Sequence, residues 1–360
     1  MAKILASSDS DLGEIKRLLD NNVPSYRQAY SDRTAWIMAC VAELAYIRFN
    51  PLWSNEELKG YFLDKISNLL DENKKSSLVK LIDIVAYDPE IEKQKLESEL
   101  GILNMKLLKP TFDSEGTQAI LVSFKDFIIL GFRGTEATSI KDIKADAKAK
   151  TTSCETNGMI HSGFKEAFEH VRLDIEKKLK EEECKDKPLF ISGHSLGGAL
   201  ATIAAKKLSH TGGLAACYTF GSPRVGDEEW IEDIKTPIYR LVNAADCVTM
   251  LPPSSETITV VGWLAQFLPW VGKSLRSLLL SNFGGYLHCG NMRYLTNCPS
   301  GQYENVKLLY SVSIFYRIKG LIIKKMPWKH FLADHSIGVY RNKLKVIALN
   351  RNPNVDKANV

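Results

Sequence analysis

Residues 189–205 have the sequence LFISGHSLGGALATIAA, in which an apolar run, a glycine-rich turn and an alanine-rich run follow one another. The apolar run predicts a buried strand, and the alanine-rich run predicts an α-helix with few breakers. A serine on the tight turn between a strand and a helix takes a positive φ and needs small residues two positions to either side. Gly193 and Gly197 meet this requirement, so Ser195 is a candidate nucleophile in an elbow that also contains His194.

A chance pattern and a phosphate-binding loop could also produce a turn of this kind. A GxSxG pattern can arise by chance in a glycine-rich loop, but the flanking strand and helix argue against chance. A phosphate-binding loop carries Lys and then Ser or Thr after its last glycine, whereas Ala199 and Leu200 follow the last glycine here. The nucleophile interpretation is therefore favoured.

The rest of the chain predicts an α/β architecture. From residue 102 onward, short apolar runs alternate with helical segments, which is typical of a mostly parallel sheet. The runs lie at 102–108, 117–124, 127–132, 189–192, 215–220 and 238–242. We expect a hairpin between the second and third of these runs.

Three regions are expected along the chain. Residues 1–101 predict an N-terminal helical region that packs on the core and holds no chemistry of its own. Residues 102–350 form the α/β domain, and residues 351–360 form a C-terminal tail.

The composition is that of an ordinary globular chain. With 360 residues, 45% of them hydrophobic and 9% aromatic, the chain is long enough for one large core and a smaller appendage. Its seven cysteines include no CxxC pair, so we expect no disulfide scaffold and no zinc site. We also expect no cofactor, because a serine nucleophile activated by a base needs neither a metal ion nor an organic group. The N-terminal residues lack the apolar stretch of a secretory signal, and we expect a cytoplasmic location.

A serine hydroxyl becomes a nucleophile when a base removes its proton, and that base needs an acid to fix its tautomer. In one known chain order of such triads the acid and then the histidine follow the serine, with the acid placed after a later strand. Asp246 follows the strand predicted at 238–242 and is the candidate acid. Asp227, Asp233 and Asp334 are alternatives, of which Asp334 better suits a helix N-cap.

Among the seven histidines, this chain order leaves three candidates for the base. His335 stands at the start of a predicted final helix and is the preferred candidate. His288 opens a strand-like run and is the second candidate, whereas His330 belongs to a basic stretch and is expected to be solvated.

A tetrahedral intermediate also needs hydrogen-bond donors for its oxyanion. The backbone N–H of Leu196, at the start of the helix, is one expected donor. The loop after the strand at 127–132 is expected to supply the other, because Thr135 offers both an N–H and a hydroxyl. A simple turn made flexible by Gly134 is the alternative.

Five separated motifs resemble one family, the class 3 or fungal-type lipases of the α/β-hydrolase fold. The motifs are FRGT (132–135), HSGF (161–164), GHSLGGA (193–199), FGSPRVG (220–226) and NAADCVTMLPP (243–253). A final DHS (334–336) is similar to the histidine motif of this family, and the likeness covers about residues 102–350.

This resemblance implies the α/β-hydrolase fold, with a mostly parallel central sheet flanked by helices. The sequence adds to it the N-terminal helical region and a cap-like insertion. The resemblance also implies that Ser195 is the nucleophile, Asp246 the acid and His335 the base, with Thr135 and Leu196 as oxyanion donors. The implied activity is hydrolysis of acyl-lipid esters, as in triacylglycerol lipases. The alternatives are a phospholipase A1, a lysophospholipid or monoacylglycerol lipase, and a lipid-binding scaffold on an inactive hydrolase fold.

Two insertions at 254–284 and 300–330 lengthen the spacing between the acid and the base. Residues 257–272 carry no charge, yet they are too few to span a membrane and contain a proline. Residues 258–345 contain twelve Lys and Arg but only two acidic residues. The insertions are expected to form either a packed cap or a peripheral contact with an anionic membrane surface.

Two further expectations concern partners and the lid. Nucleic acid is not an expected partner, because no recognised module accompanies the basic charge. Residues 139–146 are similar to the lid of the family, although they are more polar.

Overall fold

The structure is a computed structural model of the chain. It describes residues 4–20, 28–49, 88–134, 151–153, 157–244, 246–253, 285–313, 316–317 and 333–351. The segments 139–146 and 254–284, expected to form a lid and an insertion, lie outside the described residues, as does most of 314–330.

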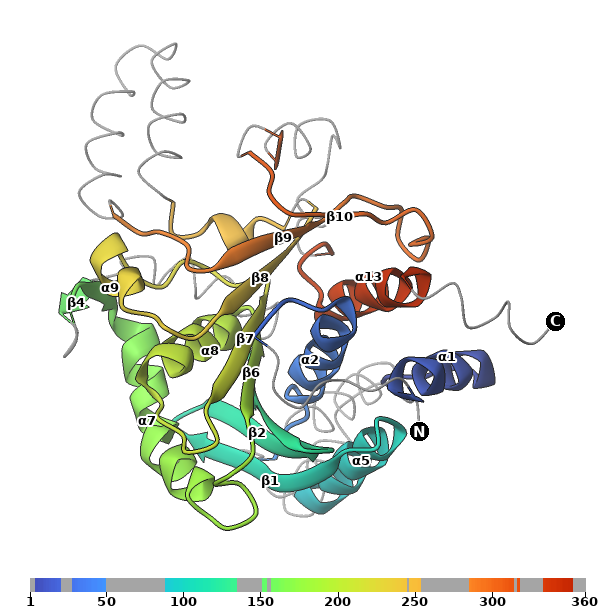
Figure 1. Ribbon diagram of the computed structural model, residues 1–360, viewed down its shortest axis with the longest axis horizontal. Helices are drawn as coiled ribbons and strands as arrows, with labels where there is room; N and C mark the ends of the chain where they lie inside the picture. Colours follow the sequence, from blue (N-terminus) through green and yellow to red (C-terminus); the bar gives the residue numbers. More distant parts are fainter. Residues whose placement is uncertain are drawn as a thin grey trace, which may run out of the picture.

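The centre of the molecule is an eight-stranded sheet with the strand order β1-β2-β3-β6-β7-β8-β9-β10 (Figure 1). Strands β3, β6, β7, β8 and β9 run parallel, and antiparallel pairs form both edges. The expectation of a mostly parallel sheet is confirmed. The strands are β1 (Lys106–Ser114), β2 (Thr117–Phe124), β3 (Phe127–Phe132), β6 (Leu189–His194), β7 (Leu214–Phe220), β8 (Ile238–Asn243), β9 (Asn291–Leu295) and β10 (Leu308–Leu309). A separate hairpin pairs β4 (Thr151–Ser153) with β5 (Met159–His161).

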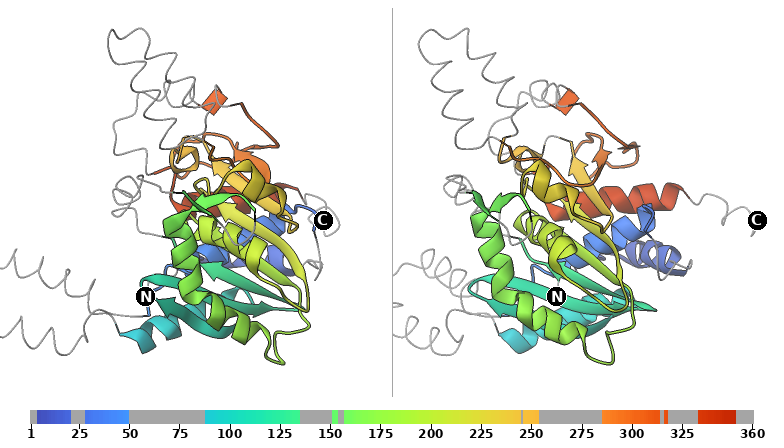
Figure 2. Two further views of the ribbon diagram at one scale, coloured as in Figure 1. Left: turned by 90° about the vertical axis from the view of Figure 1, so that its left-hand side faces the viewer. Right: turned by 60° about the vertical axis from the view of Figure 1, so that its left-hand side comes forward.

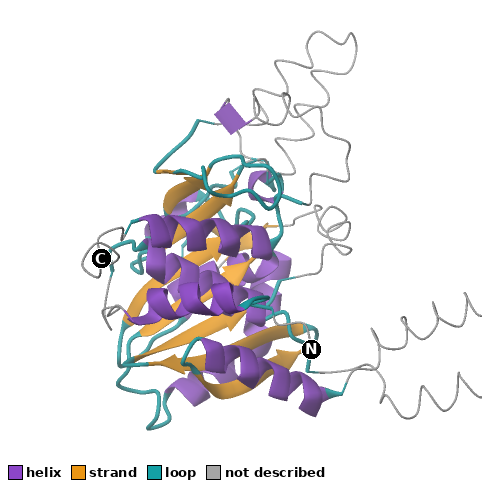
Figure 3. Ribbon diagram, turned by 90° about the vertical axis from the view of Figure 1, so that its right-hand side faces the viewer, coloured by secondary structure: helices purple, strands orange, loops and turns teal. Residues whose placement is uncertain are grey.

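Helices cover both faces of the sheet and produce three layers. The described helices are α1 (Asp9–Asp20), α2 (Asp32–Leu44), α5 (Pro89–Ile102), α7 (Ser162–Leu179), α8 (Leu196–Lys207), α9 (Glu228–Glu232) and α13 (Ile337–Asn350). Helices α7 and α8 lie on one face, seen from their side in Figure 2, left. Helices α2 and α13 pack together on the other face, which is toward the viewer in Figure 3.

The central strands are buried because both of their faces are apolar. All six residues of β3 are buried, and successive side chains alternate between the two faces of the sheet. Phe127 and Ile129 pack into the core under α2 and α13. Ile128 and Leu130 pack into the core under α7 and α8. This double burial places β3 and its neighbour β6 in the middle of the sheet.

One predicted strand differs from the structure. The apolar run at 102–108 was expected to be a strand, but α5 continues to Ile102 and the strand begins at Lys106. Leu103 caps the helix and is fully buried with it, so part of the apolar run belongs to helix packing. Asn104 then takes a φ of 54° and redirects the chain into β1.

The two ends of the described chain are joined through buried polar groups. The Glu99 carboxylate accepts hydrogen bonds from the backbone N–H groups of Ile4 and Leu5 at 2.7 and 3.0 Å. The Arg341 guanidinium on α13 donates to the carbonyls of the same two residues at 3.1 and 3.3 Å, and it pairs with Glu43 on α2. Helices α1, α2 and α5 share one core with the sheet and α13.

Among the described residues, no helix is long and apolar enough to cross a membrane.

Candidate active site

The turn between β6 and α8 forces Ser195 into an uncommon backbone conformation. Its φ of 57° and ψ of −127° lie where L-residues are strained. A Cβ atom on Gly193 would overlap the carbonyl of Gly197, and one on Gly197 would overlap the carbonyl of Phe132. The two glycines thus permit the close contacts that lift Ser195 out of the strand.

Of the two expected oxyanion donors, the structure describes Leu196 but not Thr135. Leu196 is the first residue of α8, so its N–H belongs to the helix turn whose amides lack partners within the helix. Thr135 lies outside the described residues. The preceding residue, Gly134, touches the elbow, since a Cβ on it would lie 3.2 Å from Cβ of Ser195. The end of β3 therefore reaches the candidate nucleophile.

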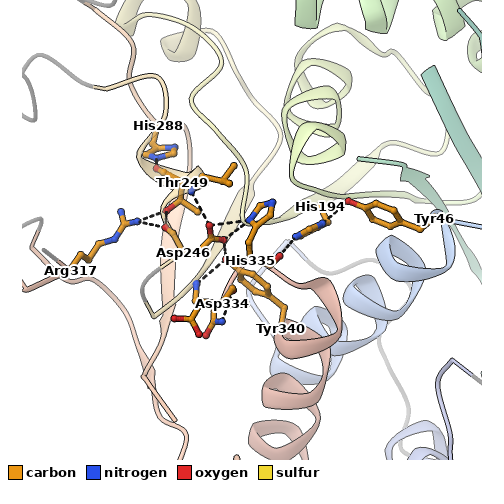
Figure 4. Close-up of polar contacts among 11 residues, drawn as sticks. Tyr46, His194, Asp246, Thr249, His288, Arg317, Asp334, His335 and Tyr340 are labelled. Carbon is orange, nitrogen blue, oxygen red and sulfur yellow. Dashed lines mark hydrogen bonds and ion pairs between the residues drawn. The ribbon is translucent and has the colours of Figure 1, made fainter. Parts of the chain in front are cut away.

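Asp246 and His335 come together from separate parts of the chain (Figure 4). Nδ1 of His335 lies 2.9 and 3.0 Å from the two carboxylate oxygens of Asp246. Asp246 also accepts the Tyr340 hydroxyl at 2.6 Å and the backbone N–H of Val248 at 3.0 Å. The carboxylate is fully buried, and its oxygens are held by three different donors.

Two atoms of the expected triad have no hydrogen-bond partner among the described residues. Oγ of Ser195 and Nε2 of His335 are both buried, and neither has a hydrogen-bond partner in the described part of the chain. Because Asp246 engages Nδ1, that nitrogen carries the proton and Nε2 keeps a lone pair able to accept one. The backbone N–H of Ser195 donates to the carbonyl of Phe220, the residue before Gly221.

Gly221 is a site residue for which the sequence suggested no individual role. Its φ is 58°, and a Cβ atom on it would lie 2.7 Å from Oδ2 of Asp246 and 2.9 Å from Nδ1 of His335. A side chain here would push Asp246 and His335 apart. The FGSPRVG motif contains this glycine, and its position directly after a strand was the available signal.

The competing histidine and one competing aspartate have other partners. Nε2 of His288 lies 2.6 Å from the carbonyl of Thr249, and burial, with Arg240 next, holds the pKa of His288 well below 6.5. Asp227 caps α9 by accepting from the N–H of Trp230 at 2.9 Å.

The remaining two aspartates have other places in the fold. Asp233 is the C-terminal cap residue of α9. The expectation that Asp334 caps the final helix is wrong, because Ser336 is the N-cap residue of α13.

Several basic residues of the region 258–345 point inward. Arg317 is 5% exposed and donates through Nη2 to the carbonyl of Asp246 at 3.3 Å and to the Thr249 hydroxyl. Burial lowers the pKa of Arg317, whereas the charge of Asp246 raises it. Arg341 and Lys343 are buried as well. These three cations contribute to the interior and not to a basic surface.

The described residues contain no group of three His, Cys, Asp or Glu that could hold a metal ion. A serine on a strand-to-helix elbow lies at the carboxyl ends of parallel strands flanked by helices. The residue before this serine is hydrogen-bonded to the carbonyl of a histidine whose Nδ1 meets a buried aspartate. Together these features define an α/β-hydrolase.

One stretch of the chain matches a known family. Residues 129–256 match the family model of the class 3 lipases, described as Lipase (class 3). A secreted mono- and diacylglycerol lipase 1 of Fusarium solani is 38% identical over 100 residues, covering 26% of this chain and 30% of that protein. The chloroplastic phospholipase A(1) DAD1 of Arabidopsis thaliana is 31% identical over 150 residues, covering 35% of this chain and 33% of that protein.

A solved structure resembles the whole fold. The crystal structure of a lipase from Rhizopus microsporus var. chinensis has a TM-score of 0.50 and 21% sequence identity, covering 88% of this chain and 91% of that one. This likeness concerns the fold. The matches to the two sequence relatives span only 30% and 33% of those proteins' own length.

Proposed function

We propose that the protein is a serine hydrolase that cleaves carboxylic esters of acyl lipids through an acyl-enzyme on Ser195. The observation that carries the proposal is the buried His335 imidazole, with Nδ1 on the Asp246 carboxylate and Nε2 without a partner among the described residues. An imidazole held in this way can act as a general base, because only its Nε2 is free to accept a proton from a hydroxyl.

In the proposed mechanism, Nε2 of His335 removes the proton from the Ser195 hydroxyl as Oγ attacks the acyl carbonyl. The N–H groups of Leu196 and Thr135 bind the oxyanion that forms. When the ester C–O bond breaks, the alcohol leaves with the proton from His335, and the acyl group stays on Oγ. Water then attacks the acyl-enzyme with His335 again as the base, which releases the fatty acid and restores Ser195.

Asp246 has an electrostatic role in this mechanism. Its carboxylate keeps the proton of His335 on Nδ1 and stabilises the imidazolium that forms after proton transfer. The Tyr340 hydroxyl and the Val248 N–H occupy other lone pairs of the carboxylate. Asp246 therefore has a fixed orientation before the substrate binds.

We propose glycerolipids as the substrate class. The names of two relatives, a mono- and diacylglycerol lipase and a phospholipase A(1), support an acyl ester of glycerol and leave the head group open. Triacylglycerol lipase, phospholipase A1 and lysophospholipid or monoacylglycerol lipase all use the same machinery and differ in the pocket. We also propose a cytoplasmic location, with the insertions at 254–284 and 300–330 as either a packed cap or a peripheral contact with an anionic membrane surface.

Hydrolysis of p-nitrophenyl esters from C2 to C16 by the wild type and Ser195→Ala, with and without anionic vesicles, tests this proposal. We expect Ser195-dependent activity that rises with chain length and on vesicles. Activity confined to short esters would contradict the lipid substrate, and activity that survives in Ser195→Ala would contradict the nucleophile. Failure of a fluorophosphonate to label Ser195 would favour a lipid-binding scaffold.

The head group is tested separately. Rates on triolein, diolein, monoolein and dioleoyl phosphatidylcholine, measured at equal interfacial area, distinguish the lipase from the phospholipase. A preference for the phospholipid would replace the glyceride assignment by phospholipase A1.

A further inference from the structure

The His194 side chain connects the nucleophile elbow to the backbone of the base. Nε2 of His194 lies 2.6 Å from the carbonyl oxygen of His335, and Nδ1 lies 2.7 Å from the Tyr46 hydroxyl. A carbonyl can only accept, so Nε2 carries the proton and Nδ1 accepts the Tyr46 O–H. The rings of His194 and His335 are tilted against each other with centroids 4.5 Å apart.

His194 is neutral in this position. The ring is buried, and burial followed by the neighbouring His335 holds the pKa of His194 well below 6.5. With both nitrogens hydrogen-bonded and no charge, the ring is a fixed donor to one carbonyl.

The preceding carbonyl is held from a second strand. Nδ2 of Asn243, at the end of β8, donates to the carbonyl of Asp334 at 2.7 Å. Oδ1 of Asn243 in turn accepts from Nζ of Lys343 at 2.7 Å, a side chain that is 1% exposed. Two consecutive carbonyls, those of Asp334 and His335, are therefore held by side chains from the ends of two parallel strands.

We infer that His194 is a positioning residue for the base, acting through the backbone of His335 in concert with Asn243. His335 lies in a turn before α13, where no helix or sheet ladder fixes its backbone. His194 directly precedes Ser195, so the hydrogen bond from His194 ties the base to the nucleophile's own elbow. This inference rests on the proposed hydrolase function, in which His335 is the base.

Tyr46 fixes the tautomer that this positioning requires. Its hydroxyl donates to Nδ1 of His194 and would overlap a Cβ atom placed on Gly134. Without the hydroxyl, the proton of His194 could move to Nδ1, and Nε2 would then face the His335 carbonyl with a lone pair. The chain just after α2 thus contacts the elbow, the loop before Thr135 and, through His194, the base.

Replacement of His194 by two residues of similar size tests the inference. His194→Gln retains a donor that can reach the carbonyl of His335, and His194→Met does not. On a soluble p-nitrophenyl ester, we expect kcat of His194→Met to fall about 10- to 100-fold, the range that a small misplacement of a catalytic group causes. We expect His194→Gln to stay within about 3-fold of wild type, with KM and Tm alike in the two variants.

The outcomes separate the inference from the proposed function. Equal kcat in the two variants, or a loss that follows Tm, would overturn the positioning role. If His194→Met does not fold, Tyr46→Phe tests the same two hydrogen bonds, from Tyr46 to His194 and from His194 to the His335 carbonyl. An unchanged kcat in Tyr46→Phe would overturn the positioning role of His194.

If the wild type shows no Ser195-dependent hydrolysis, the proposed function fails, and NMR of ¹⁵N-histidine-labelled protein decides the positioning role. A His335 Nδ1–H resonance that is sharp in the wild type and His194→Gln but broadened in His194→Met would support it. The same resonance in all three proteins would contradict it.

Discussion

Gly221 lies directly against His335: a Cβ atom on the glycine would be 2.9 Å from Nδ1 of the imidazole. The same atom would be 2.7 Å from Oδ2 of Asp246. The hydrogen bond between the acid and the base therefore depends on the absence of a side chain at the residue that follows β7.

Gly221→Ala is expected to reduce kcat by about 100-fold, because the methyl group must displace His335 or Asp246. The variant also carries the strain of a non-glycine residue at positive φ, which costs about 1–2 kcal/mol. Gly116→Ala is the matched control, since Gly116 has a φ of 81° and nothing within 4 Å of its Cβ position. Steady-state kinetics on one ester compare the two variants. An equal loss of activity in Gly221→Ala and Gly116→Ala would refute the steric role of Gly221.

Tyr340→Phe is expected to lower kcat by about 10-fold and the free energy of unfolding by about 1.5–3 kcal/mol, because a buried carboxylate loses a donor. Burial and the Asp246 charge raise the pKa of Tyr340 well above 10, so its hydroxyl remains a donor. Tyr294→Phe is the control, because its buried hydroxyl donates at 3.2 Å to the neutral carbonyl of Ala244. Urea unfolding and ester kinetics measure both effects, and a fully active Tyr340→Phe would argue against the role.

The stability of the protein is expected to fall as the pH decreases from 6.5 to 5.5. Burial holds the pKa of His194 and His288 well below 6.5 in the folded state. Above pH 6.5 both states are neutral at these positions; below it the unfolded chain takes up protons that the folded chain does not. Each histidine then removes up to about 1.4 kcal/mol per pH unit.

His194→Gln and His288→Gln each remove one of these contributions. Urea unfolding at several pH values should therefore show a shallower slope in each variant and the shallowest in the double variant. A slope equal to that of the wild type would indicate that the two histidines are protonated in the folded state.

Glu99→Ala is expected to destabilise the fold by about 1–3 kcal/mol without changing kcat, because it leaves one buried and one partly buried N–H group without an acceptor. These are the N–H groups of Ile4 and Leu5. Glu97→Ala on the exposed side of the same helix is the control. Thermal and urea unfolding measure the difference, and equal stabilities would contradict the role of Glu99 as an anchor.

The sequence predicted best the strands that are buried on both faces. The run Phe127–Phe132 is apolar at every position, and it forms a fully buried central strand. The strand at 102–108 was misplaced because Leu103 is apolar for a different reason, its burial beside the end of α5. Apolar character alone does not tell a strand from the end of a helix.

The candidate triad could be predicted because a strand-to-helix turn and a strand end are local patterns; the catalytic roles of Ser195, Asp246 and His335 stay predictions. Tyr46 and Tyr340 could not be found in this way. Tyr46 is 148 residues from His194, and Tyr340 is 94 residues from Asp246. No periodicity or turn signal encodes such contacts, and the first 101 residues were expected to hold no chemistry.

The order in which the site is completed follows from the packing of α13 on α2. The turn carrying His335 comes directly before α13, and Arg341 of that helix holds Ile4 and Leu5. During translation the ribosome delivers the elbow with Ser195 well before α13. A nascent chain thus contains the proposed nucleophile before the proposed base, and we expect no Ser195-dependent hydrolysis until α13 packs on α2.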